Sequence, residues 1–153
     1  MKLQLVRSTR LAVLAISIAA AGCAAPSGGT GNGNSGTLYA RLGGEPVVNQ
    51  VVTRSIERAA HDPRTQRSFD GIKLAAVEKS IVQQICSISG GGCKYEGETM
   101  AKAHKDLKIR PGEFDALVDI MREEFDAAGV DAGAKNELLK LLAPMKRDIV
   151  PAG

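Results

Sequence analysis

Two histidines and three cysteines are the side chains of this chain whose types and spacing support specific chemistry. His104 follows Met100 by one helical turn, so a helix here would place an imidazole beside an apolar side chain. A neutral imidazole nitrogen is a common ligand for transition metals. A lone histidine on a helix is more often a surface or core residue, so composition alone leaves both interpretations of His104 open.

Cys86 and Cys93 remain as an even pair once Cys23 is set aside. A disulfide between them would close an eight-residue loop across the glycines at 90–92, worth about 2.5 kcal/mol on the chain-entropy model. Two free buried thiols are the alternative. The pair is too small for a closed zinc site, and no histidine stands nearby in sequence.

Several function classes find no support in the sequence. The chain carries 20 Lys and Arg against 17 Asp and Glu, and Lys2, Arg7 and Arg10 supply the whole excess. From Cys23 onward the charge is therefore balanced, which removes the electrostatic motive for binding nucleic acid. We find no nucleophile with a nearby base and no phosphate loop between a strand and a helix.

The first 22 residues have the features of an export signal. A positive leader precedes an apolar stretch at 11–21, which is shorter than the roughly 20 residues of a spanning helix. The ending Ala20-Ala21-Gly22-Cys23 resembles the lipobox of bacterial lipoproteins, in which the cysteine is lipidated and becomes the mature N-terminus. We expect a lipoprotein anchored at Cys23 and facing the periplasm, with a soluble periplasmic product as the alternative.

Residues 23–37 are rich in Gly, Ser and Asn and predict a flexible tether. A Gly-rich chain of this length has a root-mean-square reach of roughly 20 Å, enough to hold a domain clear of a lipid surface. The remaining domain, residues 38–150, shows no convincing strand alternation.

Helical patterns account for that domain. Pro46 lies in the first turn of a helix that Asp62-Pro63 ends, and the segment 73–88 has the strongest amphipathic spacing. A short helix is expected within 99–106. Pro111 begins another helix that ends near Gly129, and Asp131 is the expected N-cap of a last helix that continues to Ile149. Its apolar stripe includes Leu138, Leu139, Leu141, Leu142, Met145 and Ile149.

The order of motifs across 38–150 resembles the group I truncated haemoglobins. The resemblance rests on Leu38-Tyr39-Ala40-Arg41-Leu42-Gly43-Gly44, Asp62-Pro63-Arg64 with Phe69, Gly90-Gly91, Lys94-Tyr95-Glu96-Gly97 with Met100, Ala103-His104, and Leu142-Ala143-Pro144-Met145 through Asp148-Ile149-Val150. It implies an all-α, two-over-two helical sandwich around haem b.

The same resemblance implies a set of cofactor contacts. His104 becomes the proximal iron ligand, with Met100 one turn before it. Phe69 matches the aromatic residue that packs on the haem face, and its alternative is an ordinary core residue. Tyr95, which follows Lys94, lies where a haem propionate would be contacted.

The distal side departs from the family pattern. Group I proteins often place a Tyr in the first long helix and a Gln in the second, whereas the matching positions here hold Ile56 and Ile81, with Val77 one turn earlier. Without these donors, dioxygen storage is in doubt, and we expect less discrimination against carbon monoxide and nitric oxide. The neighbouring Ser80, Gln83 and Gln84 are expected to point away from iron.

The resulting hypothesis is a tethered haem protein that reversibly binds a diatomic gas, dioxygen or nitric oxide. Whether it is an enzyme stays open, because nitric oxide dioxygenation would require an electron donor that the sequence does not identify. The alternatives are a haem-free globin-shaped interaction module and a haem sensor or transfer protein. His61 is expected to be a surface cap of its helix, and the alternative is a second axial ligand.

Overall fold

The computed structural model describes residues 36–151. The expected signal peptide, Cys23 and most of the tether lie outside this range. Within it, no helix is both long enough and apolar enough to cross a membrane.

Helices and turns make up the described part of the chain, which contains no strand. The elements are α1 (Leu38–Arg41), α2 (Gly44–His61), η1 (Gln66–Phe69), α3 (Leu74–Ile88), α4 (Met100–His104), α5 (Pro111–Ala127), α6 (Ala132–Leu142), η2 (Ala143–Met145) and α7 (Lys146–Ile149), where η marks a 3-10 helix. The predicted all-α fold class is confirmed.

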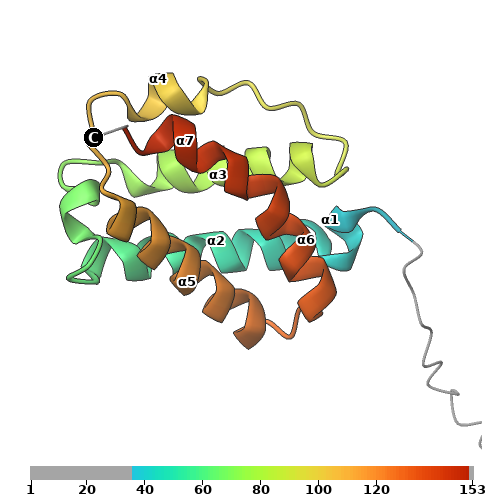
Figure 1. Ribbon diagram of the computed structural model, residues 1–153. Coiled ribbons are helices and arrows are strands. Elements are labelled where there is room, and N and C mark those ends of the chain that lie inside the picture. The colour runs from blue at the N-terminus through green and yellow to red at the C-terminus, as the bar shows by residue number, and fades with distance from the viewer. Residues whose placement is uncertain (1–35, 152–153) are drawn as a thin grey trace, which may run out of the picture. The chain divides into compact units, whose positions relative to one another are not determined.

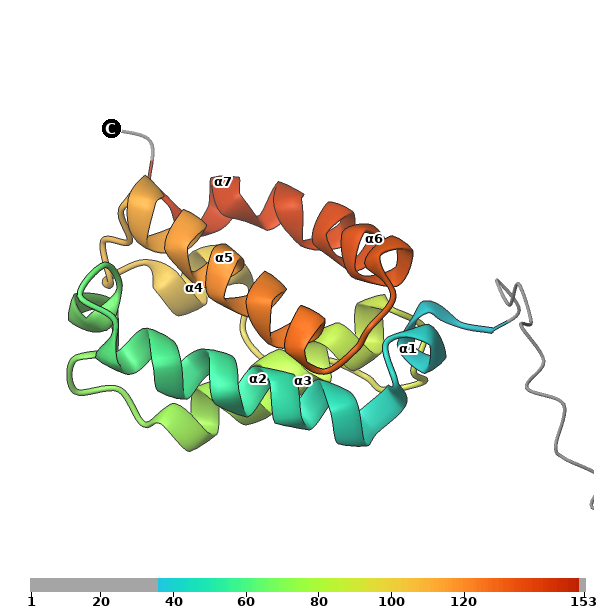
Figure 2. The ribbon, with the colours of Figure 1, turned by 90° about the horizontal axis from the view of Figure 1, so that it is seen from below.

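The long helices form two layers of two. The helices α2 and α3 lie side by side in one layer, and α5 packs across α2 in the other (Figure 1). The view from below shows α6, η2 and α7 following one another as the second member of that layer, beside α5 (Figure 2). The short helix α4 packs on α7.

The hydrophobic core lies where the four long helices meet. Its buried members come from α1, α2, α3, α5 and α6, and include Val48, Val51, Val52, Ile56, Ile85, Met121, Phe125 and Leu138. Most of them share one stripe of their helix at spacings of three and four, as an amphipathic helix requires. Burial of these side chains is the main source of stability for the fold.

Two predicted helix starts are confirmed. Pro111 is the first residue of α5, where the missing amide hydrogen removes no helical hydrogen bond. Asp131 is the N-cap of α6, and its Oδ1 accepts hydrogen bonds from the amides of Gly133 at 2.9 Å and Ala134 at 3.1 Å.

We expect Asp131→Ala to lower the free energy of unfolding by about 1 kcal/mol, because two amides at the start of α6 lose their acceptor. Urea unfolding followed by circular dichroism measures this change. Asp131→Asn is the control, since an Asn side chain keeps a capping oxygen and should cost only a small part of that amount. Equal losses in the two variants would contradict the assignment of the cap.

We predicted one continuous last helix up to Ile149, and this prediction is wrong. Residues Ala143–Met145 form a 3-10 turn between α6 and α7. Pro144 has no amide hydrogen, and its ring clashes with the carbonyl four residues earlier in an α-helix, so the helix is interrupted there. Leu141, expected on the buried stripe, is 41% exposed.

A short helix in front of α2 was also missed. The side chain of Thr37 caps α1, and Gly43 then turns the chain into α2 with a φ of 93°. A Cβ at Gly43 would lie 2.7 Å from Cβ of Val47. The turn therefore requires glycine both for its positive φ and for lack of space.

The cysteine pair is joined as a disulfide between Cys86 of α3 and Cys93, with the two Cα atoms 5.6 Å apart. This separation lies in the ordinary range for such bridges. The alternative of two free thiols is therefore wrong in this structure.

Candidate functional site

A mostly apolar cavity of about 150 Å³ lies between the two layers, next to α4. Side chains from α2, η1, α3, α4, α5, α7 and the loops beside them line it. They are Ile56, Thr65, Ser68, Phe69, Ile72, Val77, Ile81, His104, Leu107, Ile109, Glu113, Phe114, Leu117 and Ile149. The cavity thus brings together five residues that the sequence singled out: Ile56, Phe69, Val77, Ile81 and His104.

His104 reaches this cavity from the last residue of α4. The hydroxyl of Thr99 caps the helix by accepting a hydrogen bond from the amide of Lys102 at 3.3 Å. One turn further on, Nδ1 of His104 lies 2.8 Å from the carbonyl oxygen of Met100. Because a carbonyl only accepts, Nδ1 carries the proton, and in the neutral ring the lone pair is then on Nε2. That nitrogen is the one suited to bind a metal.

His61 has the same local geometry in a different place. Its Nδ1 lies 2.8 Å from the carbonyl oxygen of Glu57, one turn earlier in α2. The side chain is exposed at the end of the helix and lines no part of the cavity. Only His104 of the two histidines therefore faces an apolar space of molecular size, and His61 lies where a surface cap was expected.

Aliphatic and aromatic side chains of α2, η1 and α3 form one part of the cavity wall, which the hydroxyl-bearing Thr65 and Ser68 line as well. Ile56 is fully buried, whereas Phe69, Val77 and Ile81 are half-buried and pack against the core. None of these four side chains can donate a hydrogen bond. A small molecule on this side would meet only apolar groups from them.

Met100 and Tyr95 do not line the cavity, and their roles as cofactor contacts stay predictions. Met100 supplies the carbonyl that holds His104. The hydroxyl of Tyr95 lies 3.3 Å from Oγ of Ser80 and donates to the carbonyl of Glu98 at 3.1 Å. Ser80, Gln83 and Gln84 are absent from the cavity wall as well.

A buried carboxylate at one end of the cavity was not foreseen. Glu113, 8% exposed, accepts hydrogen bonds from Nε of Arg67 at 2.7 Å and from Nη2 at 2.5 Å, and from the amide of Arg110 at 2.7 Å. The Arg67 guanidinium, reinforced by that amide, lowers the pKa of Glu113 to about 2. Arg67 also donates to the carbonyl of Lys108 at 3.0 Å, which ties down the loop that follows His104. The position of Glu113 two residues after Pro111 was the sequence signal of this capping role.

The low pKa of Glu113 predicts an acid-sensitive fold. A carboxyl group whose folded pKa of about 2 lies below its ordinary 4.5 contributes stability above the ordinary value. This contribution is lost as the pH falls through that interval. We expect Glu113→Gln to be less stable than the parent at pH 7 and to lose less stability on acidification, as measured by urea unfolding at a series of pH values. Glu96→Gln, which removes an exposed partner of Lys94, is the control and should leave the pH profile unchanged.

A second and larger cavity, about 480 Å³, opens on the side where α2 faces α3. Its wall mixes apolar side chains with charged and polar ones, including Glu45, Glu78 and Lys79. Burial, followed by the charge of Glu45, raises the pKa of the nearby Tyr39. No histidine lines this cavity, so it lacks the potential metal ligand that His104 supplies to the smaller cavity.

Fold and site together define a small two-layer helical protein with an imidazole directed into an apolar pocket. Comparison with known proteins agrees with that class. The Bacterial-like globin family matches residues 37–150. The group 1 truncated haemoglobin GlbN of a Nostoc species is 31% identical over 114 residues, which are 74% of this chain and 97% of that protein. GlbN of a Synechocystis species is 28% identical over 120 residues, with the same two shares.

Solved structures show the same fold. The truncated haemoglobin of Tetrahymena pyriformis in its Fe(III) form superposes with a TM-score of 0.72 at 24% identity, over 76% of this chain and all of that one. The 2/2 haemoglobin of a Synechococcus species, with covalently attached haem, gives 0.70 at 21% identity, over 75% and 98%. The chain belongs to the bacterial-like globin family and has the two-over-two fold of the truncated haemoglobins.

Proposed function

We propose that this protein binds haem b and uses it to bind a diatomic gas reversibly, with His104 as the proximal iron ligand. The observation that carries the proposal is the direction of His104. Its Nδ1 is engaged by the carbonyl of Met100, which leaves Nε2 for a metal at the edge of an apolar cavity. Membership of the globin family supports the same assignment.

The residues around the cavity would suit a largely apolar group, which the imidazole of His104 would hold. Phe69, Val77 and Ile81 line the same cavity as His104 and would provide the apolar contact. Haem iron, when bound, supplies the site at which a diatomic gas coordinates. The cavity, at about 150 Å³, is smaller than the roughly 300–1,000 Å³ of typical ligand pockets, so its walls must move apart to take up haem.

The apolar side chains of the distal wall determine which gas is favoured. Ile56, Val77 and Ile81 exclude water and offer no hydrogen bond to a polar ligand. Dioxygen gains more from such a bond than nitric oxide or carbon monoxide does, because it is the more polar when bound. We therefore infer that nitric oxide or transient dioxygen binding is favoured over oxygen storage. Redox catalysis would in addition need an electron donor.

We also propose that the domain works outside the cytoplasm, tethered to a membrane by a lipid on Cys23. The signal-like residues 1–22 and the lipobox-like ending support this, and the Cys86–Cys93 disulfide is of the kind that persists in an oxidising compartment. The mass of the mature N-terminus, measured on protein from a membrane fraction, tests the anchor. An unmodified residue at that terminus would favour the soluble periplasmic product.

The experiment for the function as a whole is a haem titration of the exported protein, followed by absorption spectra of its ferric and ferrous-carbonyl forms. We expect an intense Soret band that saturates at one haem per chain and shifts when carbon monoxide binds. A protein that retains no haem after gel filtration would contradict the proposal.

The alternatives named above have a specific observation in their favour, which is the small volume of the cavity. A haem-free interaction module would show no saturation in the titration. A haem sensor or transfer protein would bind haem at one site and release it readily to a competing apoprotein.

A further inference from the structure

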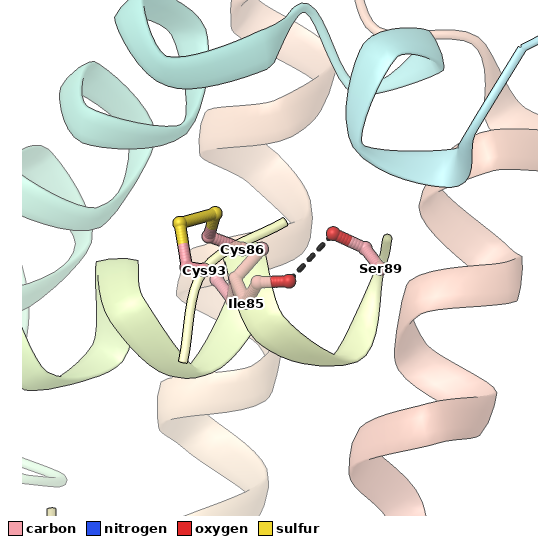
Figure 3. Close-up of a disulfide and its surroundings, with 4 residues drawn as sticks. All are labelled: Ile85, Cys86, Ser89 and Cys93. Atoms are coloured by element: carbon pink, nitrogen blue, oxygen red, sulfur yellow. Dashed lines mark hydrogen bonds between the residues drawn. A yellow bond between two sulfur atoms is a disulfide. The ribbon is translucent and has the colours of Figure 1, made fainter. Parts of the chain in front are cut away.

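The Cys86–Cys93 disulfide joins α3, which lines the proposed haem site, to the connector that leads to the helix of His104. Cys86 belongs to α3, whose Val77 and Ile81 line the cavity. Cys93 lies in the α3–α4 connector, defined here as residues 89–99, which leads directly to the helix of His104. The bridge lies on the side of α3 that faces α2, and the connector passes beside it (Figure 3).

Few other interactions hold the connector in place. At its beginning, the hydroxyl of Ser89 donates to the carbonyl of Ile85 at 2.5 Å, the amide of Gly91 donates to the carbonyl of Cys86 at 2.8 Å, and the carbonyl of Ser89 accepts from the amide of Tyr39 at 2.8 Å. Beyond Cys93 the tie to α3 is the contact of Tyr95 with Ser80. The connector contains no helix or strand of its own, and the disulfide is the cross-link that ties it back to α3 beyond the peptide backbone.

The start of the connector is packed closely around the bridge. A Cβ built at Gly91 would lie 2.6 Å from Sγ of Cys86 and 2.7 Å from Cδ1 of Tyr39. Glycine is therefore required for the chain to turn back under the disulfide. This close fit fixes the direction in which the connector leaves α3.

We propose that Cys86 and Cys93 are a positioning pair for His104, so that tight retention of haem requires the oxidised chain. The helix α4 has only five residues, too few to be stable alone, so its orientation depends on its packing against α7 and on what holds its ends. Arg67 holds the loop after it, and the disulfide holds the connector before it. The inference rests on the proposed function, since it assumes that His104 ligates haem.

The surroundings of the two cysteines favour a disulfide that resists reduction once it has formed. Cys86 is 1% exposed and near the C-terminal end of α3, where the helix dipole disfavours the thiolate that must leave on reduction. Cys93 is exposed, so its sulfur is the one open to attack. A dithiol would form a mixed disulfide with Cys93, release Cys86 and then close to its own cyclic disulfide, passing two electrons to the protein. The haem site would thus be completed after export, where the disulfide forms.

The test measures loss of ferric haem from the full exported chain to excess apomyoglobin, in the oxidised, dithiothreitol-reduced and reoxidised states. We expect reduction to accelerate haem loss by about tenfold, the order expected when one additional residue must be ordered for ligation. Reoxidation should restore the slow rate. The double variant Cys86→Ser/Cys93→Ser should lose haem at the fast rate with or without dithiothreitol, which controls for direct effects of the reagent on haem.

Asp131→Ala separates positioning from general stability, because it weakens the fold at α6, away from α4. Its haem loss should stay at the oxidised wild-type rate, and its ferrous iron–imidazole stretching band should match the parent, whereas the band of the reduced protein should shift. Equal haem loss in oxidised and reduced protein would overturn the inference and leave the proposed function intact. An oxidised chain that takes up no haem would instead overturn the proposed function.

Discussion

Replacing His104 with Gly is expected to accelerate haem loss more than about 100-fold, since even the groups that orient metal ligands are worth about 10–100-fold in metal affinity. The substitution removes the one imidazole that faces the cavity. Added imidazole should restore a five-coordinate ferrous spectrum, because the free ligand can enter the space that the side chain leaves. Absorption spectra and transfer to apomyoglobin measure both effects.

His61→Gly is the matched control for that substitution. His61 makes the same hydrogen bond to the carbonyl four residues before it, yet it is exposed and lines no part of the cavity. Its removal should leave haem affinity and spectra unchanged. A six-coordinate ferric spectrum in the parent that disappears in His61→Gly would instead support the second-ligand hypothesis for this residue.

Replacing Ile81 with Gln is expected to slow the dissociation of dioxygen by roughly 10- to 150-fold, the range for a hydrogen bond to a charged partner. Ile81 lines the cavity from α3, so an amide at this position would face the gas ligand. Stopped-flow mixing of the oxygenated protein with a carbon monoxide solution gives the rate.

Ile81→Leu provides the control, since it keeps the wall apolar at nearly constant volume and should change the rate little. Carbon monoxide dissociation from Ile81→Gln should also change far less than dioxygen dissociation. If dioxygen dissociates slowly from the parent itself, the distal wall is not as apolar as Ile56 and Ile81 indicate, and the protein does not disfavour oxygen storage.

Much of the fold was predictable because local signals and tertiary packing agree. The stripe of Val48, Val51, Val52 and Ile56 is the buried face of α2, and Pro111 and Asp131 mark true helix starts. The prediction of the last helix failed because its apolar spacing and its proline favour different structures. The apolar spacing through Met145 suggested one long helix, yet Pro144 cannot donate the amide hydrogen bond that the α-helix needs at that point.

The site was less accessible to reasoning from residues. His61 and His104 make identical local hydrogen bonds, and only the tertiary fold exposes one and directs the other to a cavity. Resemblance to a family, rather than periodicity, distinguished them in the sequence. The low pKa of Glu113 could not be predicted from the sequence either. It depends on Arg67, which lies 46 residues earlier and approaches Glu113 only in the folded chain.

The most direct test of the account is resonance Raman spectroscopy of the ferrous, gas-free protein with two iron isotopes. Ligation by His104 predicts an iron–imidazole stretching band that shifts with the iron isotope, persists in His61→Gly and is absent from His104→Gly. A haem-loaded parent without that band, or a band that survives in His104→Gly, would contradict the assignment of His104 as the iron ligand.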